Sequence, residues 1–203
     1  MLFSVLAALA LCATSVNAHF LLLSPVPRGE FVEDNEVNFC GGYNDAVSNR
    51  STFPLSGGSF SINTPHIGFT VGVLLSTEKD PNSWESFSMN GTQTFVRDYA
   101  KEEDAGTFCI PLDIAAAKIP GAVDGANVTI QVVFQGGDGN LYQCADLTLS
   151  SNLTAVSNAS CTNTTTSSSS STGGNSGVGQ LEYLSTFATA SALSLAGLAA
   201  AFL

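Results

Sequence analysis

The sequence predicts an all-β fold, an antiparallel sandwich with few helical residues. Three segments are predicted as strands because they alternate apolar and polar residues or are rich in apolar ones: residues 66–75, 128–132 and 141–149. Turn signals separate the strands at the short intervals of a sandwich: Gly57-Gly58, Asp80-Pro81-Asn82, Asn90-Gly91, Asp124-Gly125 and Gly136-Gly137-Asp138-Gly139. The expected helical segment is brief, at residues 113–118.

The amino-terminal segment is typical of a secretory signal peptide. Residues 2–12 form an apolar run, and Val16-Asn17-Ala18 supplies the small residues that signal peptidase prefers. We therefore expect residues 1–18 to be removed, although this leader contains no Lys or Arg. The mature chain would then begin at His19, one of two histidines in 203 residues.

The carboxyl-terminal segment resembles a glycosylphosphatidylinositol (GPI) attachment signal. Residues 187–203 are uncharged and mostly apolar, and a polar spacer separates them from small residues around Asn175. We expect the anchor at Asn175, with Gly174 and Ser176 as alternatives, and removal of residues 176–203. A membrane-spanning helix is disfavoured, because the run is at the short limit for a span and no basic residue follows it.

Between these ends lie one folded domain and a spacer. Residues 162–175 are almost wholly Thr, Ser, Asn and Gly, a composition that cannot bury a core and suits a glycosylated stalk. Residues 19–161 have the size of one ordinary domain, near the mode of ~100–150 residues. Sequons for N-glycosylation, which fit a secreted glycoprotein, stand at Asn49, Asn90, Asn127, Asn152, Asn158 and Asn163.

The net charge limits the classes of partner that the protein could bind. The formal net charge is −11, which excludes nucleic acid as a partner because binding to phosphates needs clustered Lys and Arg. An acidic surface favours metal cations, and solubility alone is the other explanation for the charge.

Without the leader, an even set of cysteines remains: Cys40, Cys109, Cys144 and Cys161. In an oxidising compartment this set predicts two disulfides, and three pairings are open.

A histidine at the mature amino terminus points to copper. His19 would offer two nitrogens, its free amine and its ring Nδ1, which can close a chelate ring on one ion. His66 is the only other histidine and would supply a third nitrogen from the junction of a loop and a predicted strand. Such a set suits Cu(II), which favours tetragonal nitrogen and oxygen ligands, and binding should weaken in acid because protons compete for the nitrogens. As a lone internal histidine, His66 is also compatible with an ordinary surface or core position.

Several motifs run in order through nearly the whole mature domain: His19-Phe20, Pro25, Arg28-Gly29, Phe39-Cys40-Gly41-Gly42, Arg50-Ser51-Thr52-Phe53-Pro54-Leu55, His66 and Gly139-Asn140-Leu141-Tyr142-Gln143-Cys144-Ala145-Asp146. Together they resemble fungal copper proteins related to lytic polysaccharide monooxygenases, and more narrowly their GPI-anchored copper-acquisition branch. The resemblance implies an immunoglobulin-like β-sandwich, a histidine brace that binds one Cu(II) ion, and the pairings Cys40–Cys144 and Cys109–Cys161.

That branch is known for an aspartate as an additional copper ligand, and two residues compete for the role here. Asp138 lies in a Gly-rich loop before the predicted strand 141–149, and Asp146 lies within that strand. In the monooxygenases the corresponding strand approaches copper at its beginning, so the resemblance favours Asp138. Asp146 would lie roughly 25 Å further along an extended chain, at ~3.3 Å per residue. Without a metal, Asp138 would be an ordinary turn aspartate and Asp146 a strand carboxylate.

Departures from the monooxygenases set the expected function. Aligned on Cys144-Ala145, Leu141 and Gly139 stand where the enzymes that act on cellulose usually present a Tyr and a Gln, so we expect no oxidative polysaccharide cleavage. The resemblance implies a copper-acquisition or copper-homeostasis protein at the outer face of the plasma membrane or in the cell wall. Its partners would be copper and a surface importer or reductase. A copper-dependent polysaccharide monooxygenase and a structural wall mannoprotein are the alternatives.

Overall fold

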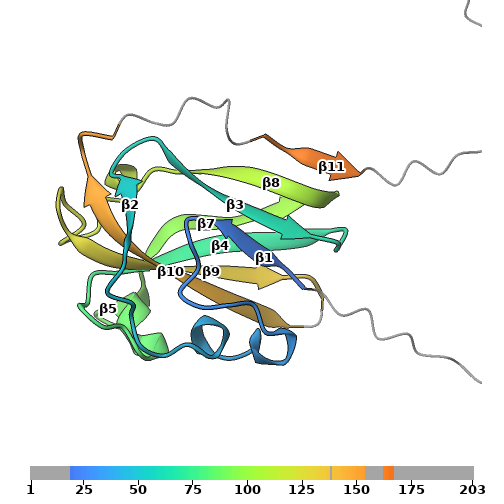
Figure 1. Cartoon of the computed structure of the whole chain (residues 1–203), viewed down its shortest axis with the longest axis horizontal. Coiled ribbons are helices and arrows are strands. Elements are labelled where there is room, and N and C mark those ends of the chain that lie inside the picture. The colour runs from blue at the N-terminus through green and yellow to red at the C-terminus, as the bar shows by residue number, and fades with distance from the viewer. Residues whose placement is uncertain (1–18, 138, 154–161, 167–203) are drawn as a thin grey trace, which may run out of the picture. The chain divides into compact units, whose positions relative to one another are not determined.

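The structure, a computed structural model, describes residues 19–137, 139–153 and 162–166. These residues form the expected immunoglobulin-like β-sandwich, with 3-10 turns beside its strands (Figure 1). No helix in the part of the chain that the structure describes is long and apolar enough to cross a membrane. Outside the described residues lie the expected leader, the expected anchor signal, Asp138, Asn158, Cys161 and Asn175.

One sheet has four strands in the order β1-β3-β8-β11, and its three pairings are antiparallel. Its strands are β1 (Leu21–Ser24), β3 (Gly58–Thr64), β8 (Ala105–Leu112) and β11 (Thr164–Thr166). The residues that follow His19 therefore enter the fold as an edge strand. Leu21 of this strand lies opposite Asn63 of β3.

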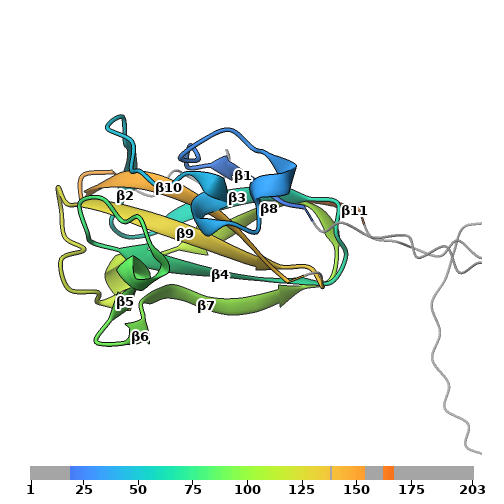
Figure 2. The ribbon, with the colours of Figure 1, turned by 90° about the horizontal axis from the view of Figure 1, so that it is seen from below.

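The other sheet has five strands in the order β2-β10-β9-β4-β7, and Figure 2 shows β7, β4, β9 and β10 following one another across it. Its strands are β2 (Ser51–Pro54), β10 (Asn140–Ser150), β9 (Asn127–Gln135), β4 (Phe69–Ser76) and β7 (Phe95–Glu102). β2 runs parallel to β10, and the other pairs are antiparallel. A separate hairpin joins β5 (Ser88–Met89) to β6 (Thr92–Gln93).

The core lies between the sheets and contains a row of aromatic rings. β3 buries every second residue, as expected of a strand with one face toward the core. Phe20 stacks on Phe134, and Phe134 on Phe69, with ring centroids 5.0 and 4.7 Å apart. Because Phe20 is fully buried and directly follows His19, the packing of the core fixes the backbone next to His19.

A second apolar cluster covers the outer face of the five-stranded sheet, so β9 and β4 bury residues on both faces. Two 3-10 turns contribute to it, η2 (Phe39–Gly42) and η3 (Trp84–Phe87). The other 3-10 turn of this region, η1 (Glu33–Asn35), precedes η2. The cluster consists of Phe39, Cys40, Leu74, Phe87, Val133 and Cys144.

A disulfide between Cys40 and Cys144 joins η2 to β10, across a sequence separation of 104 residues. This confirms the pairing that the family resemblance implied. Cys109 is disulfide-bonded as well. Its expected partner, Cys161, lies outside the described residues, so the second pairing stays a prediction.

The strand predicted at residues 66–75 begins later than expected, at Phe69. Gly68 has a φ of 74°, a left-handed conformation that the pleat of a strand does not accept, and it separates the loop from β4. His66 therefore lies in the loop between β3 and β4, and its placement at the start of a strand was wrong. The strands predicted at residues 128–132 and 141–149 are confirmed as parts of β9 and β10.

The helix expected at residues 113–118 is a single 3-10 turn, η4 (Ala115–Ala117). Asp113, before the turn, accepts a hydrogen bond from the Ala116 N–H at 3.1 Å. The turn ends at Lys118, which takes a left-handed conformation. Helices are therefore a minor part of the described fold, as the sequence predicted.

A buried ion pair fastens the loop after β1 to β10. Arg28 donates from Nε and Nη2 to the two carboxylate oxygens of Asp146, at 3.0 and 2.9 Å, and both side chains are almost fully buried. Such a two-point contact is the strongest geometry that an arginine and a carboxylate can form. The Nη1 atom of Arg28 donates to the carbonyl oxygens of Tyr43, Asn44 and Pro81.

The Arg28 pair also decides the charge of Asp146. Burial by itself would raise the pKa of this carboxyl group. Hydrogen bonds from Arg28, from the Thr129 hydroxyl and from the Val47 N–H outweigh the burial and hold the pKa below the ordinary value of 3.8. Asp146 is therefore ionised at any pH at which the protein would function.

We predict that Arg28→Met destabilises the fold by about 3–5 kcal/mol at neutral pH, because it removes the two-point cationic partner of a buried carboxylate and leaves it only Arg50, at 3.7 Å, and the hydrogen bonds from Thr129 and Val47. The lowered pKa of Asp146 means that the pair stabilises the fold above about pH 4 and that this contribution disappears as the pH falls further. Urea unfolding at pH 7 and pH 3 measures both effects.

Lys101→Met is the matched control, because Lys101 pairs with Glu103 at 2.8 Å on the exposed surface. Its loss should cost less than about 1 kcal/mol. Equal, small losses in the two variants would show that the buried pair does not hold β10 in place.

Candidate metal site

Gln143 holds the strand that follows the expected cleavage point. Its side-chain Oε1 accepts from the Leu22 N–H at 3.0 Å, and its Nε2 donates to the Phe20 carbonyl oxygen at 2.5 Å. An edge strand leaves such backbone groups without a strand partner, and the buried amide of Gln143 satisfies two of them. β1 is thereby tied to β10 as well as to β3, and the position of His19 depends on both sheets.

Thr64, the last residue of β3, joins the two histidines and is 1% exposed. Its hydroxyl donates to the His19 carbonyl oxygen at 2.7 Å and accepts from the His66 N–H at 3.1 Å. One oxygen atom is thus bonded to the backbone of both residues. The fold therefore brings the backbones of His19 and His66 close together.

The imidazole of His66 has a ring nitrogen without a partner. Its Nδ1 atom is buried and has no hydrogen bond in the described structure. A buried polar atom left in this way costs on the order of 1–3 kcal/mol. A metal ion would remove that cost, because a neutral imidazole nitrogen is a common metal ligand. His66 therefore fits the expected ligand role.

The ring of His19 lies between two carboxylates. Its Nδ1 is 2.5 Å from Oε2 of Glu36, and its Nε2 is 2.9 Å from Oε1 of Glu33. Glu36 is 1% exposed, whereas the side chain of Glu33 is 59% exposed. The second oxygen of Glu36 accepts from the Phe20 N–H at 3.2 Å. Phe31 contacts the imidazole edge-on, with centroids 6.2 Å apart.

These contacts control the protonation of the pair. Burial by itself lowers the pKa of His19, but the hydrogen bond and negative charge of Glu36, with those of Glu33, outweigh it and raise the pKa above 6.5. Burial raises the pKa of Glu36 above its usual range, and its bonds to His19 and Phe20 only partly offset this. The contact between the two groups lies at Nδ1, the ring nitrogen that a histidine brace would use.

Of the two aspartates expected as copper ligands, the structure describes only Asp146. Asp146 is committed to Arg28, so among the described contacts it has the structural role of a buried strand carboxylate. Asp138 lies outside the described residues, between Gly137 and Gly139. Its expected role as a ligand stays a prediction.

Sequence reasoning missed the three side chains that organise this region: Thr64, Gln143 and Glu36. Thr64 lies shortly before His66, and Gln143 belongs to the motif at residues 139–146. A single Thr or Gln gives no sequence signal for a hydrogen bond to a distant backbone. Glu36 lies in the acidic run Glu33-Asp34-Asn35-Glu36, which composition alone marks as a solvated surface. Its burial depends on a hydrogen bond from the Tyr142 N–H to its carbonyl oxygen, at 2.8 Å.

The site is not a complete metal cluster in this structure. Among the described residues, no group of three or more His, Cys, Asp or Glu side chains has the spacing needed to hold a metal ion. The geometry shows instead two histidines tied through their backbones, with a buried carboxylate on the ring of one. The amine of His19, which would be free after cleavage, is a further donor beside them.

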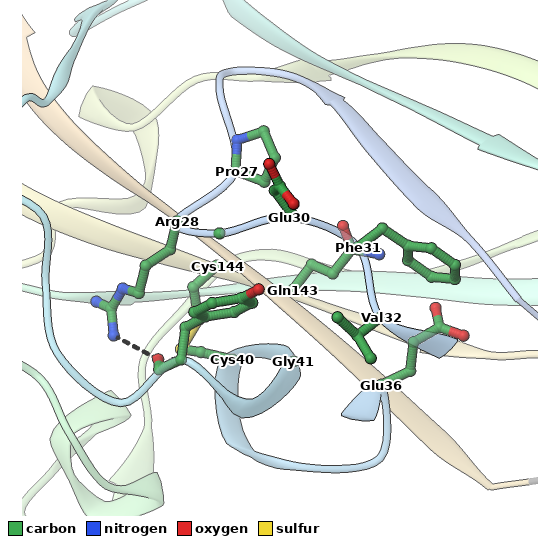
Figure 3. Close-up of a pocket in the computed structure, with 12 residues that line it drawn as sticks. Pro27, Arg28, Glu30, Phe31, Val32, Glu36, Cys40, Gly41, Gln143 and Cys144 are labelled. Atoms are coloured by element: carbon green, nitrogen blue, oxygen red, sulfur yellow. Dashed lines mark hydrogen bonds between the residues drawn. A yellow bond between two sulfur atoms is a disulfide. The ribbon is translucent and has the colours of Figure 1, made fainter. Parts of the chain in front are cut away.

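A pocket beneath the loop after β1 separates this site from the buried ion pair. Glu36 and Arg28 both line it, together with the Cys40–Cys144 disulfide. Figure 3 shows the two charged side chains at opposite ends of the pocket. The contact of Glu36 with His19 and the pair of Arg28 with Asp146 are therefore separate arrangements.

Leu141, one of the two positions that differ from the monooxygenases, has a structural role. Leu141 is 6% exposed and belongs to the main core.

Trp84, the only tryptophan in the sequence, meets Phe39 and Tyr142 edge-on, with ring centroids 5.2 and 4.4 Å apart. These aromatic rings pack at angles to one another and do not form a flat row.

Comparison with known proteins supports the copper chemistry that this geometry fits. Residues 17–166 match the family described as copper acquisition factor BIM1-like. The matched range contains both histidines, Glu36, Thr64 and Gln143.

Individual relatives agree with the family match. The chain is 38% identical over 156 residues to copper acquisition factor BIM1 of Cryptococcus neoformans var. grubii, covering 76% of this chain and 70% of that protein. It is 38% identical over 153 residues to BIM1 of Cryptococcus neoformans var. neoformans, covering 74% and 69%. It is 32% identical over 172 residues to the lytic polysaccharide monooxygenase-like protein X325 of Yarrowia lipolytica, covering 77% and 58%. The chain therefore belongs to the copper acquisition factor BIM1-like family.

Proposed function

We propose that this protein binds one Cu(II) ion at the cell surface through a histidine brace and serves in copper acquisition or homeostasis. The brace consists of the amine and Nδ1 of His19, freed by signal-peptide cleavage, and a ring nitrogen of His66. An acidic oxygen lowers the net charge of the complex. The observation that carries the proposal is the Thr64 hydroxyl, which is bonded to both histidines.

Copper capture accounts for features that a structural wall protein does not need. A surface glycoprotein gains nothing from a buried imidazole nitrogen without a partner, as found at His66, or from three buried polar side chains around its first residues. Two relatives named as copper acquisition factors support the same role. Oxidative cleavage of polysaccharide is not part of the proposal, because Leu141 stands in the core where the enzymes present a Tyr.

The placement of two of the glycosylation sequons, Asn127 and Asn152, favours access to the brace. β9 begins at Asn127 and ends at Gln135, which lies opposite Thr70, shortly after His66 in the chain. Asn127, and Asn152 after the end of β10, therefore lie at the end of the sheet away from the histidines. Sugars there would leave the copper site open to a surface importer or reductase.

A GPI anchor would place the site on the outer face of the plasma membrane or in the adjoining wall. A tether raises the effective concentration of bound copper near a membrane partner, without any new contact between them. We propose this location from the carboxyl-terminal sequence pattern.

We predict that blocking the terminal amine abolishes tight copper binding. Inserting Gln between Ala18 and His19 gives a mature terminus that cyclises to pyroglutamate and has no free amine. Cu(II) affinity should fall by more than the roughly 10–100-fold typical of losing an outer-sphere partner. Calorimetry and electron paramagnetic resonance (EPR) on full-length chains secreted from a yeast host measure the loss, with the processed terminus verified by mass spectrometry.

The unaltered protein, processed in the same host, is the control. It should give an axial, nitrogen-rich Cu(II) spectrum that the blocked protein lacks. Equal affinity and identical spectra for the two proteins would contradict the brace.

We predict that Thr64→Val weakens copper binding while Thr64→Ser does not. Valine keeps the shape of the side chain but removes the hydroxyl that is bonded to His19 and His66. Loss of these bonds should destabilise the fold by about 1–3 kcal/mol and broaden the Cu(II) EPR spectrum, because the two histidines are no longer held together. Identical copper spectra for the Val and Ser variants would show that Thr64 does not organise the site.

A further inference from the structure

A groove lies beside the first residue of β9, at the end of the sheet away from the histidines. Its lining comes from three places: residues 46–48 and Arg50 in the loop before β2, Lys79 and Asp80 in the loop after β4, and Asn127. The volume of the groove is about 420 Å³, which lies within the range of ~300–1,000 Å³ typical of sites for small molecules.

Hydrogen bonds hold the two loops that form the groove. Arg50 donates from Nη1 to the Val128 carbonyl oxygen at 2.9 Å and from Nη2 to the Lys79 carbonyl oxygen at 3.0 Å. Asp80 accepts from the Ala46 N–H at 2.7 Å. The groove is therefore preformed, and a ligand that enters it does not have to order the loops.

The groove offers polar groups of the kinds that a sugar can bind. Ser48 has a hydroxyl that donates and accepts, the Lys79 ammonium group donates, and the Asp80 carboxylate accepts. All three residues are exposed. A carbohydrate, with many hydroxyl groups and no charge, matches this mixture of donors and acceptors.

Asn127 connects the groove with one particular carbohydrate. It is the acceptor residue of the sequon Asn127-Val128-Thr129. Its Oδ1 accepts from the Thr148 hydroxyl at 2.8 Å, which fixes the side-chain amide through its oxygen. The amide nitrogen is the atom that carries the sugar in an N-glycan. Because Asn127 lines the groove, the first N-acetylglucosamine would be attached at the edge of the groove.

The sequon of Asn127 is accessible only before the domain folds. Thr129 is fully buried, and its hydroxyl donates to Asp146 and accepts from Arg28. An enzyme that has to recognise this hydroxyl cannot reach it in the folded domain. A sugar on Asn127 is therefore already present when the two loops pack beside β9.

We propose that the groove holds the first N-acetylglucosamine of an N-glycan on Asn127. The covalent link gives the sugar a high effective concentration, so a weak intrinsic affinity is enough to keep it in place. Bonds from the sugar to Ser48, Lys79 and Asp80 join the two loops to β9 and stabilise the fold. The rest of the glycan is thereby held at the end of the sheet away from the histidines.

Asn49 provides a matched control. Its sequon, Asn49-Arg50-Ser51, lies in one of the two loops. Its neighbours Ser48 and Arg50 line the groove, but Asn49 does not. A glycan on Asn49 has the general effects of glycosylation without a sugar in the groove.

The test compares Asn127→Gln with Asn49→Gln in the full-length protein, secreted by a yeast host, with the occupancy of each sequon determined by mass spectrometry. We expect Asn127→Gln to lower the thermal unfolding midpoint by roughly 2–4 °C. Asn49→Gln should lower it by less than about 1 °C, as for other surface changes. Enzymatic trimming of the unaltered protein to a single N-acetylglucosamine should keep the midpoint, because only the first sugar lies in the groove.

Lys79→Ala separates the sugar contact from the loss of the Asn127 amide. In the glycosylated protein this change should lower the unfolding midpoint. In the Asn127→Gln background it should have no further effect, because the sugar that Lys79 contacts is gone.

The proposal is overturned if Asn127 carries no glycan, or if Asn127→Gln and Asn49→Gln lower the midpoint equally. It is also overturned if Lys79→Ala has the same effect in both backgrounds. Binding of the free disaccharide of N-acetylglucosamine to the groove of the glycosylated protein would contradict it as well, because the groove would then be open and its ligand supplied from outside.

Discussion

The proposed copper site depends on one constraint: a chain terminus could act as a chelating ligand only if the backbone behind it were fixed. Free termini fray, because few contacts hold them. Here Phe20 is buried in the aromatic row of the core, directly after the histidine. Gln143 and Thr64 then bind the backbone on either side of it. The core and buried hydrogen bonds supply the energy that orders the backbone around His19, so a bound metal would not need to supply it.

The two buried acidic residues of the described fold, Asp146 and Glu36, have different kinds of partner. Asp146 is neutralised by a two-point contact with Arg28, which fixes β10 against the loop after β1. Glu36 has no arginine and meets only a titratable ring and an N–H group. A carboxylate in the first arrangement is unavailable to a metal. The strand that Asp146 secures also carries Gln143, which binds the backbone of Phe20 and Leu22.

The fold and the pair of histidines could be predicted from the sequence, because their signals are local or positional. Alternation over residues 128–132 and the turn residues between strands indicated the sandwich. The position of His19 after a cleavage motif indicated a chelating terminus. The start of β4 could not be placed, because the effect of Gly68 depends on its φ of 74° in the folded chain.

The acidic part of the site could not be predicted for a related reason. Glu36 stands in an acidic run that looks solvated, and it is buried only because η1 and η2 fold back onto β10 and Tyr142 binds its carbonyl oxygen. Asp146 was considered because it belongs to a family motif, and only its contact with Arg28 shows its structural task. Long-range contacts of this kind leave no periodic pattern in the chain.

The most direct test of the account is a crystal structure of the processed, copper-loaded protein with the metal located by its anomalous scattering. The account predicts one copper ion bound by the amine and Nδ1 of His19 and by a ring nitrogen of His66. Copper bound elsewhere on the acidic surface, with the His19 ring still bonded to Glu36, would contradict it.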